Sequence, residues 1–167
     1  MSVETARKQR LPDWANDEEH DEPLASQDHS LTIDNLHYPL YTRFSGPHCY
    51  VASELRVHRD PGNLRDYKEP DILVAFDVPA HVRKRYIIAE EGKGPDLVIE
   101  VLSDSSKDNG DLEDKRDWYQ KEGVREYVVV DPLGHFVPEP RLQSWVFSAR
   151  TGSDAAQHVL AGADGVL

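Results

Sequence analysis

The stretch GPDLVIEVLS, residues 94–103, decides how the rest of the chain is interpreted. Aliphatic residues dominate it, yet Glu100 stands among them with Ile99 before it and Val101 after it. A glutamate is rarely buried without a partner, because taking its charge out of water costs several kcal/mol. The stretch therefore predicts a core strand over residues 96–102 that carries an ionisable acid in need of a partner.

The partner acid of Glu100 is expected on a different strand. With a period of two residues, Asp96 and Glu100 share one face of the strand, at roughly 13 Å from each other if each residue advances about 3.3 Å. That separation is too large for both to bind one ion directly. The apolar run PDILVAFDV, residues 70–78, predicts a neighbouring strand and offers Asp71 and Asp77.

A helix after this strand is expected to direct a lysine inward. Ser, Asp and Asn residues offer helix caps and Gly123 offers a stop, so the sequence predicts a helix over residues 111–122. On a period of 3.6 residues, Leu112, Lys115 and Tyr119 fall on one stripe. Lys115 is therefore expected to lean toward the sheet.

Two interpretations of a facing Glu100 and Lys115 are open. Buried ion pairs occur as plain architecture, and a lysine can lie along apolar surface with its charged end in water. Alternatively, with Asp71 expected next door, the three groups suit hydrolysis of a phosphodiester. The carboxylates would hold a divalent cation that polarises phosphate and activates water, while the lysine orients that water or stabilises developing charge.

The segments EPDILV, GPDLVIEVLSDSS and DLEDKRDWYQKEGVREYVVVDP resemble the Uma family of bacterial restriction endonucleases, within the PD-(D/E)XK nuclease superfamily. The resemblance covers residues 65–132. It implies an α/β fold with a restriction-endonuclease-like core, in which helices flank a central mixed β-sheet. It also implies a Mg²⁺ site, with Mn²⁺ as a substitute, formed by Asp71, Glu100 and the backbone carbonyl of Val101.

One position departs from the superfamily pattern. The lysine of the (D/E)XK element would fall at Leu102, and in this family it stands on the following helix, where Lys115 is found. Lys115 is therefore expected to be the catalytic base or the charge stabiliser. Many superfamily members also carry an acid on the first helix; Asp28 or Asp34 would supply it, and no spacing selects between them.

Composition and charge limit the domain organisation, the partners and the compartment of the protein. Residues 1–27 are acidic and predict a disordered tail, which leaves residues 28–167 for one nuclease-like domain. A net charge of −12 argues against broad nucleic-acid affinity but not against an enzyme that meets phosphate through a metal ion. The single Cys49 and the lack of a membrane-length apolar run favour a cytoplasmic protein with no membrane partner.

The pattern also predicts the other elements. A first helix is expected over residues 28–44, with Pro39 kinking or dividing it. Its apolar residues near helical spacing are Leu31, Leu36, Leu40 and Phe44. Strands are expected in CYVASELRVH, PDILVAFDV, REYVVVDP, LQSWVFS and QHVLA, and a hairpin-like connection is expected between the first two.

Several residues are weaker candidates. Asp96 and Tyr119 would lie around the ion without binding it. Arg83, Lys84 and Arg85 would touch phosphates, or form a solvated turn. The histidines show no pair at metal-ligand spacing and stay unassigned; those considered are His29, His37, His48 and His58.

The predicted function is magnesium-dependent endonucleolytic cleavage of DNA. One alternative is a non-catalytic binding or scaffold protein that keeps the nuclease core, which the acidic composition favours. A second alternative is a hydrolase that acts on RNA or on a nucleotide instead of duplex DNA, and the sequence does not choose among these substrates. A homodimer is expected only by analogy with other nucleases of this type.

Overall fold

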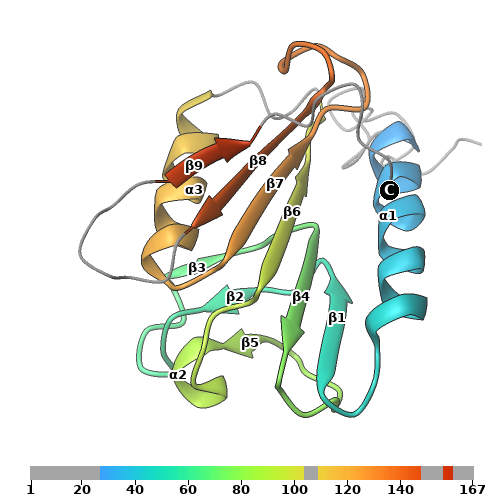
Figure 1. Ribbon diagram of the computed structural model, residues 1–167. Coiled ribbons are helices and arrows are strands. Elements are labelled where there is room, and N and C mark those ends of the chain that lie inside the picture. The colour runs from blue at the N-terminus through green and yellow to red at the C-terminus, as the bar shows by residue number, and fades with distance from the viewer. Residues whose placement is uncertain (1–26, 104–108, 148–155, 160–167) are drawn as a thin grey trace, which may run out of the picture.

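Figure 1 shows the chain as a computed structural model that describes residues 27–103, 109–147 and 156–159. The predicted acidic tail, apart from Gln27, lies outside these residues. A six-stranded sheet has the strand order β1-β4-β6-β7-β8-β9. Its strands are β1 (Cys49–Ser53), β4 (Ile72–Phe76), β6 (Leu97–Val101), β7 (Glu126–Val130), β8 (Leu142–Phe147) and β9 (Ala156–Val159). Strands β6 and β7 are parallel and all other neighbours are antiparallel, which confirms the mixed sheet.

Two longer helices flank this sheet, α1 (Gln27–Phe44) and α3 (Asn109–Lys121). A smaller sheet of order β3-β2-β5 lies beside it, formed by β2 (Val57–His58), β3 (Tyr67–Lys68) and β5 (Tyr86–Ile87), and the short α2 (Ile88–Glu91) follows. The expected strand over residues 49–58 is therefore wrong as a single element. It breaks at Glu54, which has a φ of 51°, and its two parts enter different sheets.

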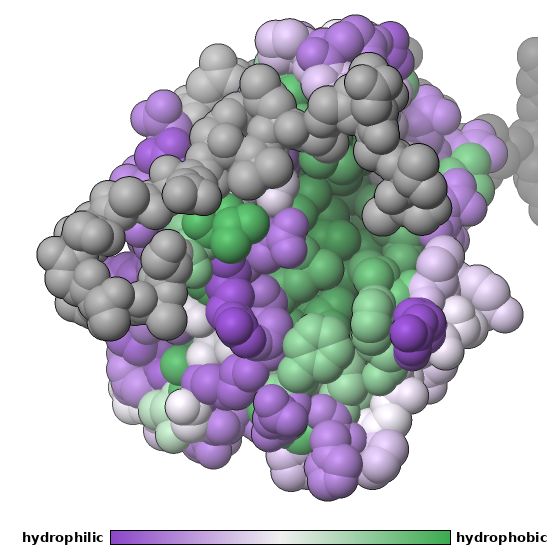
Figure 2. Space-filling view, in the orientation of Figure 1, coloured by the Kyte–Doolittle hydropathy of each residue, from purple (hydrophilic) through white to green (hydrophobic). Residues whose placement is uncertain are grey.

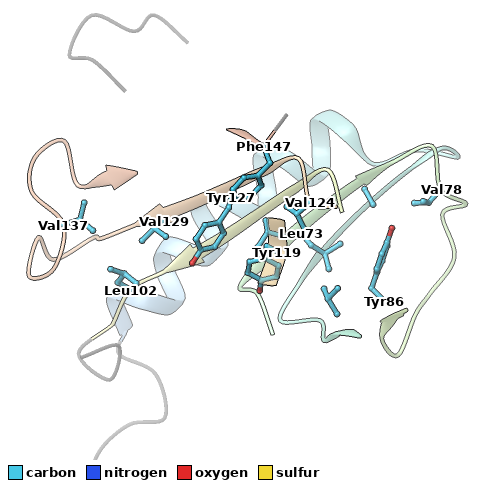
Figure 3. Close-up of a cluster of buried hydrophobic side chains, with 13 residues drawn as sticks. Leu73, Val78, Tyr86, Leu102, Tyr119, Val124, Tyr127, Val129, Val137 and Phe147 are labelled. Atoms are coloured by element: carbon cyan, nitrogen blue, oxygen red, sulfur yellow. The ribbon is translucent and has the colours of Figure 1, made fainter. Parts of the chain in front are cut away.

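The core lies mainly between the large sheet and α3 (Figure 3). Alternate residues of each strand supply it, as a period of two requires. Tyr119 of α3 and Tyr127 of β7 are fully buried there, with ring centroids 5.3 Å apart. The small sheet adds Val57 and Tyr86 to the same cluster. The α3 face of the sheet is thus closed over by side chains, and any polar group on it needs an internal partner.

Helix α1 packs on the opposite face, against β1 and β6. It continues through Pro39, so of the expected kink or division, the division is wrong. Pro39 and Asn35, whose carbonyl loses its N–H donor, are both exposed, so water can replace the missing hydrogen bond. Ile33 is the buried residue of this helix, whereas Leu31, one of the apolar residues near helical spacing, is 49% exposed.

Beyond α1, no other helix of the described residues covers the same face of the sheet. Figure 2 shows a broad apolar area on the viewed face of the molecule. A groove of about 350 Å³ lies there, lined in part by Phe44, Phe76, Leu97 and Val146. Within the described ranges, no helix combines the length and the apolar character needed to cross a bilayer.

Candidate active site

Glu100 is buried on the α3 face of β6 and receives two hydrogen bonds from that helix. The hydroxyl of Tyr119 donates to Oε1 at 3.0 Å, and the ammonium of Lys115 donates to Oε2 at 2.9 Å. Leu112 packs against the same core, so the stripe expected from helical periodicity faces the sheet. The structure therefore brings Glu100, Lys115 and Tyr119 together.

Asp71 directly precedes the neighbouring strand β4, and extending the β4–β6 register by one residue places it beside Glu100. Strands β4 and β6 pair Ile72 with Ile99 in antiparallel register, and the next position in this register is Asp71 beside Glu100. Residues paired in this way have β-carbons about 5 Å apart and point to the same face. The N–H of Val101 donates to Oδ2 of Asp71 at 2.6 Å, which fixes the carboxylate at the end of the pair of strands.

Burial and mutual repulsion shape the electrostatics of the site. Burial raises the pKa of Glu100 to about 7; the charge of Asp71 raises it as well, while Lys115 lowers it. Burial also raises the pKa of Asp71, against the hydrogen bond from Val101. For Lys115, burial lowers the pKa, but the attraction of Glu100 and other acids outweighs it and leaves the pKa raised. The ammonium is therefore retained at neutral pH.

The pair of carboxylates fits a divalent cation in its donor chemistry. Mg²⁺ is typically held by one or two carboxylates and keeps several of its waters. Among the described residues, no cluster of three or more His, Cys, Asp or Glu is arranged to hold a metal. Asp71 and Glu100 would thus be the carboxylate ligands. Val101 contacts Asp71 through its N–H, and the role of its carbonyl as a ligand stays a prediction.

Comparison with known proteins identifies the family. The Uma2 family, described as "Putative restriction endonuclease", matches residues 9–153. The chain belongs to the Uma2 family. No curated protein matches the chain. A solved structure titled as a putative nuclease belonging to DUF820 from Anabaena variabilis is similar, with a TM-score of 0.57 and 15% identity over 81% of this chain and 69% of that one. At this identity the likeness shows a shared fold.

Asp96 of this Uma2 protein lies at the other end of β6, away from the site. Its carboxylate accepts hydrogen bonds from the N–H of Phe76 at 2.8 Å and from the ammonium of Lys93 at 2.6 Å. These contacts tie the start of β6 to the end of β4. The prediction that Asp96 supports the ion is therefore replaced by a structural role. Asp77, the other acid of its strand, is exposed beyond the same end of β4.

The basic triplet separates into one buried and two exposed residues. Arg83 is 8% exposed and donates two hydrogen bonds to Glu91, at 2.7 and 2.9 Å. Its guanidinium also stacks over the ring of Tyr50 at 4.2 Å. Arg83 is thus committed to internal contacts and is withdrawn as a phosphate-binding candidate. Lys84 and Arg85 are exposed and keep that role as a prediction.

The first helix of this Uma2 protein contributes a histidine where an acid was expected. Asp28 and Asp34 are both exposed, and the structure brings neither to the site. Instead, Nε2 of His29 lies 3.5 Å from Oδ1 of Asp71. The available signal was spacing, because His29 stands four residues before the buried Ile33 and therefore on the buried side of α1.

Proposed function

We propose that this Uma2 protein is an endonuclease that hydrolyses DNA phosphodiester bonds with the aid of a divalent metal ion. One observation carries the proposal: Asp71 faces the buried Glu100, which is already paired with Lys115. A structural ion pair needs no second carboxylate. The additional acid raises the pKa of Glu100 and makes its ionised form costlier, unless a cation occupies the site.

Each residue of the site has a separate proposed role. Asp71 and Glu100 would hold Mg²⁺ or Mn²⁺, with the carbonyl of Val101 as a further ligand. When bound, the ion polarises the phosphate and activates water for attack. Lys115 remains protonated, since its pKa is raised, and so it stabilises the negative charge that develops on the phosphate. This favours the charge-stabilising role over the role of base. Tyr119 orients Glu100.

The test compares supercoiled plasmid, duplex oligonucleotides and RNA as substrates, each titrated with Mg²⁺ and Mn²⁺. We expect metal-dependent DNA cleavage by the wild type and its loss in Glu100→Gln and Lys115→Met. The matched control is Lys121→Met, which removes an exposed lysine from the same helix. Equal cleavage by Glu100→Gln, or no cleavage with either ion, contradicts the proposal. Cleavage of RNA but not of DNA would show that the protein is an RNA hydrolase instead of a DNA endonuclease.

A non-catalytic binding or scaffold protein is the second candidate, favoured by the net charge of −12. Thermal stability separates the two candidates. A cation present at 100 times its Kd adds about 2.7 kcal/mol to the free energy of unfolding, if it binds only the folded state. The endonuclease requires a rise in melting temperature with Mg²⁺ or Mn²⁺ that Asp71→Asn abolishes. The scaffold predicts no metal-dependent rise in either variant.

A further inference from the structure

The small sheet is basic, although the chain as a whole is acidic. The two segments that form its strands, residues 55–69 and 79–87, hold seven of the 19 Lys and Arg residues but only three of the 31 Asp and Glu residues. The seven bases are Arg56, Arg59, Arg65, Lys68, Arg83, Lys84 and Arg85. Of these, Arg59 and Arg83 are engaged in ion pairs with glutamates. The charge of the chain is therefore unevenly distributed.

Arg56 and Arg85 lie side by side at the start of two strands of this sheet. Strands β2 and β5 are parallel and pair Val57 with Tyr86, and the N–H of Tyr86 donates to the carbonyl of Arg56 at 2.8 Å. Val57 and Tyr86 face the core. Because side chains alternate along a strand, Arg56 and Arg85, one residue earlier, point to the opposite side. Both are exposed there.

The surroundings of His58 support this placement. His58 stands two residues after Arg56 and contacts the ring of Tyr67, with centroids 5.3 Å apart. Burial lowers the pKa of His58, and the positive charges of Arg85 and Arg56 lower it further. Both guanidinium groups thus act on the same side chain. Like charges at neighbouring positions of a sheet are destabilising, so stability of the fold does not explain this pair.

The acid on this surface is weakly held. Glu69 lies 3.2 Å from Nε of Arg56, and the two side chains are 47% and 54% exposed. An ion pair with this much exposure contributes only about 0 to 1 kcal/mol. A phosphate group can therefore replace Glu69 beside Arg56 at little cost.

The Arg56 end of the sheet adjoins the candidate active site. The N–H of Glu54 donates to the backbone carbonyl of Asp71 at 3.0 Å. Arg56 follows two residues later, which is about 7 Å along an extended chain. The small sheet also packs into the same core cluster as α3, on the α3 side of the large sheet (Figure 1). A polymer bound at Asp71 can therefore extend over the two arginines.

We propose that Arg56 and Arg85 form a surface that binds the phosphate backbone of duplex DNA. The inference rests on the proposed endonuclease function for the identity of the ligand, and it specifies how an acidic protein holds that ligand. Guanidinium groups suit phosphate, because each presents a planar fork of N–H donors. Contacts to phosphate position a duplex without reading its sequence, so binding at this surface is independent of sequence.

The first test is fluorescence anisotropy of a labelled DNA duplex titrated with the full-length protein, in EDTA and at several salt concentrations. Arg56→Gln and Arg85→Gln should each weaken binding by a similar factor for duplexes of different sequence. Each should also reduce the slope of log affinity against log salt by about 0.9. The matched control is Arg43→Gln, which removes an exposed arginine from α1 on the opposite face of the large sheet and should leave the slope unchanged.

The imidazole of His58 gives a second readout, by NMR titration. Phosphates that neutralise the two arginines should raise the pKa of His58 when duplex DNA is added to the wild type. In the double variant Arg56→Gln/Arg85→Gln, the pKa should already be raised without DNA and should not respond to it. Melting curves check that each variant folds. If Arg56→Gln does not fold, Arg85→Gln and the wild-type response of His58 still decide the question.

The outcomes distinguish this surface from the proposed catalysis. Equal salt slopes in the wild type and both arginine variants overturn the inference, as does a wild type that binds no duplex at about 50 mM salt. An equal loss of slope in Arg43→Gln overturns it as well. Metal-dependent cleavage observed together with unchanged slopes would leave the nuclease proposal standing. Reduced slopes in the two variants without cleavage under any metal would confirm the surface, and the nuclease proposal would fall.

Discussion

Lys115 donates a hydrogen bond to Glu100 from helix α3 to strand β6, with 2.9 Å between Nζ and Oε2 and side chains that are 21% and 6% exposed. The two residues come from elements that follow one another along the chain. Because both side chains are largely buried, the ammonium of Lys115 and the carboxylate of Glu100 compensate each other's charge in place of water. Removing one of them is therefore expected to have a different effect from removing both.

Lys115→Met should destabilise the protein more than the double variant Lys115→Met/Glu100→Gln does. The single change leaves Glu100 as an unpaired buried charge, which costs roughly 3 to 5 kcal/mol in comparable sites. The cost should be smaller at pH 5, where Glu100 is protonated because its pKa is about 7. Urea denaturation of the single and double variants at pH 5 and pH 8 measures this. Equal stabilities of the two variants at pH 8 would show that the pair is uncoupled.

The pH dependence of stability should carry the signature of Glu100. Its pKa is about 7 in the folded protein, above the ordinary value of 4.5, so the folded state holds this proton more tightly than the unfolded state does. The resulting stabilisation is complete below pH 4.5 and is lost as the pH rises through 7. Without metal, the free energy of unfolding of the wild type should fall by about 3 kcal/mol relative to Glu100→Gln between these limits. Parallel stability curves for the two proteins would contradict this assignment.

Tyr119→Phe should weaken metal binding while leaving the core packed. The ring is fully buried, and only its hydroxyl reaches Glu100, at 3.0 Å. Losing this donor removes an orienting contact to a proposed ligand, which typically lowers metal affinity about 10- to 100-fold. Calorimetric titration of Mn²⁺ measures the change. Tyr127→Phe is the matched control, because Tyr127 is equally buried but makes no hydrogen bond to Glu100 through its hydroxyl in the described residues.

The basic triplet should respond to substitution in two different ways. Arg83→Ala removes the paired hydrogen bonds to Glu91 and the stacking on Tyr50, so the melting temperature should drop. Lys84→Ala and Arg85→Ala should leave the melting temperature nearly unchanged, because both side chains are exposed. If they touch phosphate, each lowers DNA affinity and reduces the salt dependence of binding by about one charge. An unaltered salt dependence would remove them from the interface.

Asp131→Ala should destabilise the loop after β7. Asp131 is 1% exposed, and its carboxylate accepts hydrogen bonds from the N–H groups of Gly134, Phe136 and Val137, at 2.9, 2.6 and 2.8 Å. Burial would raise its pKa, but these donors together lower it below 3.8. Its contribution to stability is thus present above pH 3.8 and is lost as the pH falls through the lower pKa. Asp131→Ala should therefore flatten the acid end of the stability profile, which thermal melts between pH 2 and pH 6 would show.

Local sequence patterns were sufficient to predict which faces of the strand and the helix carry the residues of the site. Alternation placed Glu100 on the face of β6 opposite Ile99 and Val101, and the helical period directed Lys115 and Tyr119 toward the sheet. Such periodicities depend only on backbone geometry, so they survive in any fold that buries one face of each element. They did not locate the break at Glu54, where the chain leaves one sheet for another, because that choice depends on contacts with β4 and β5.

The sequence by itself determined the amphipathic elements, the α/β class and the need of Glu100 for a partner. Only the tertiary structure decided which residues meet. Strand register set Asp71 beside Glu100 and brought the N–H of Phe76 to the carboxylate of Asp96. The packing of α1 brought His29 to Asp71 instead of Asp28 or Asp34. These contacts join residues distant along the chain, and the free energy that selects them comes from the packing of whole faces, which no short stretch of sequence records.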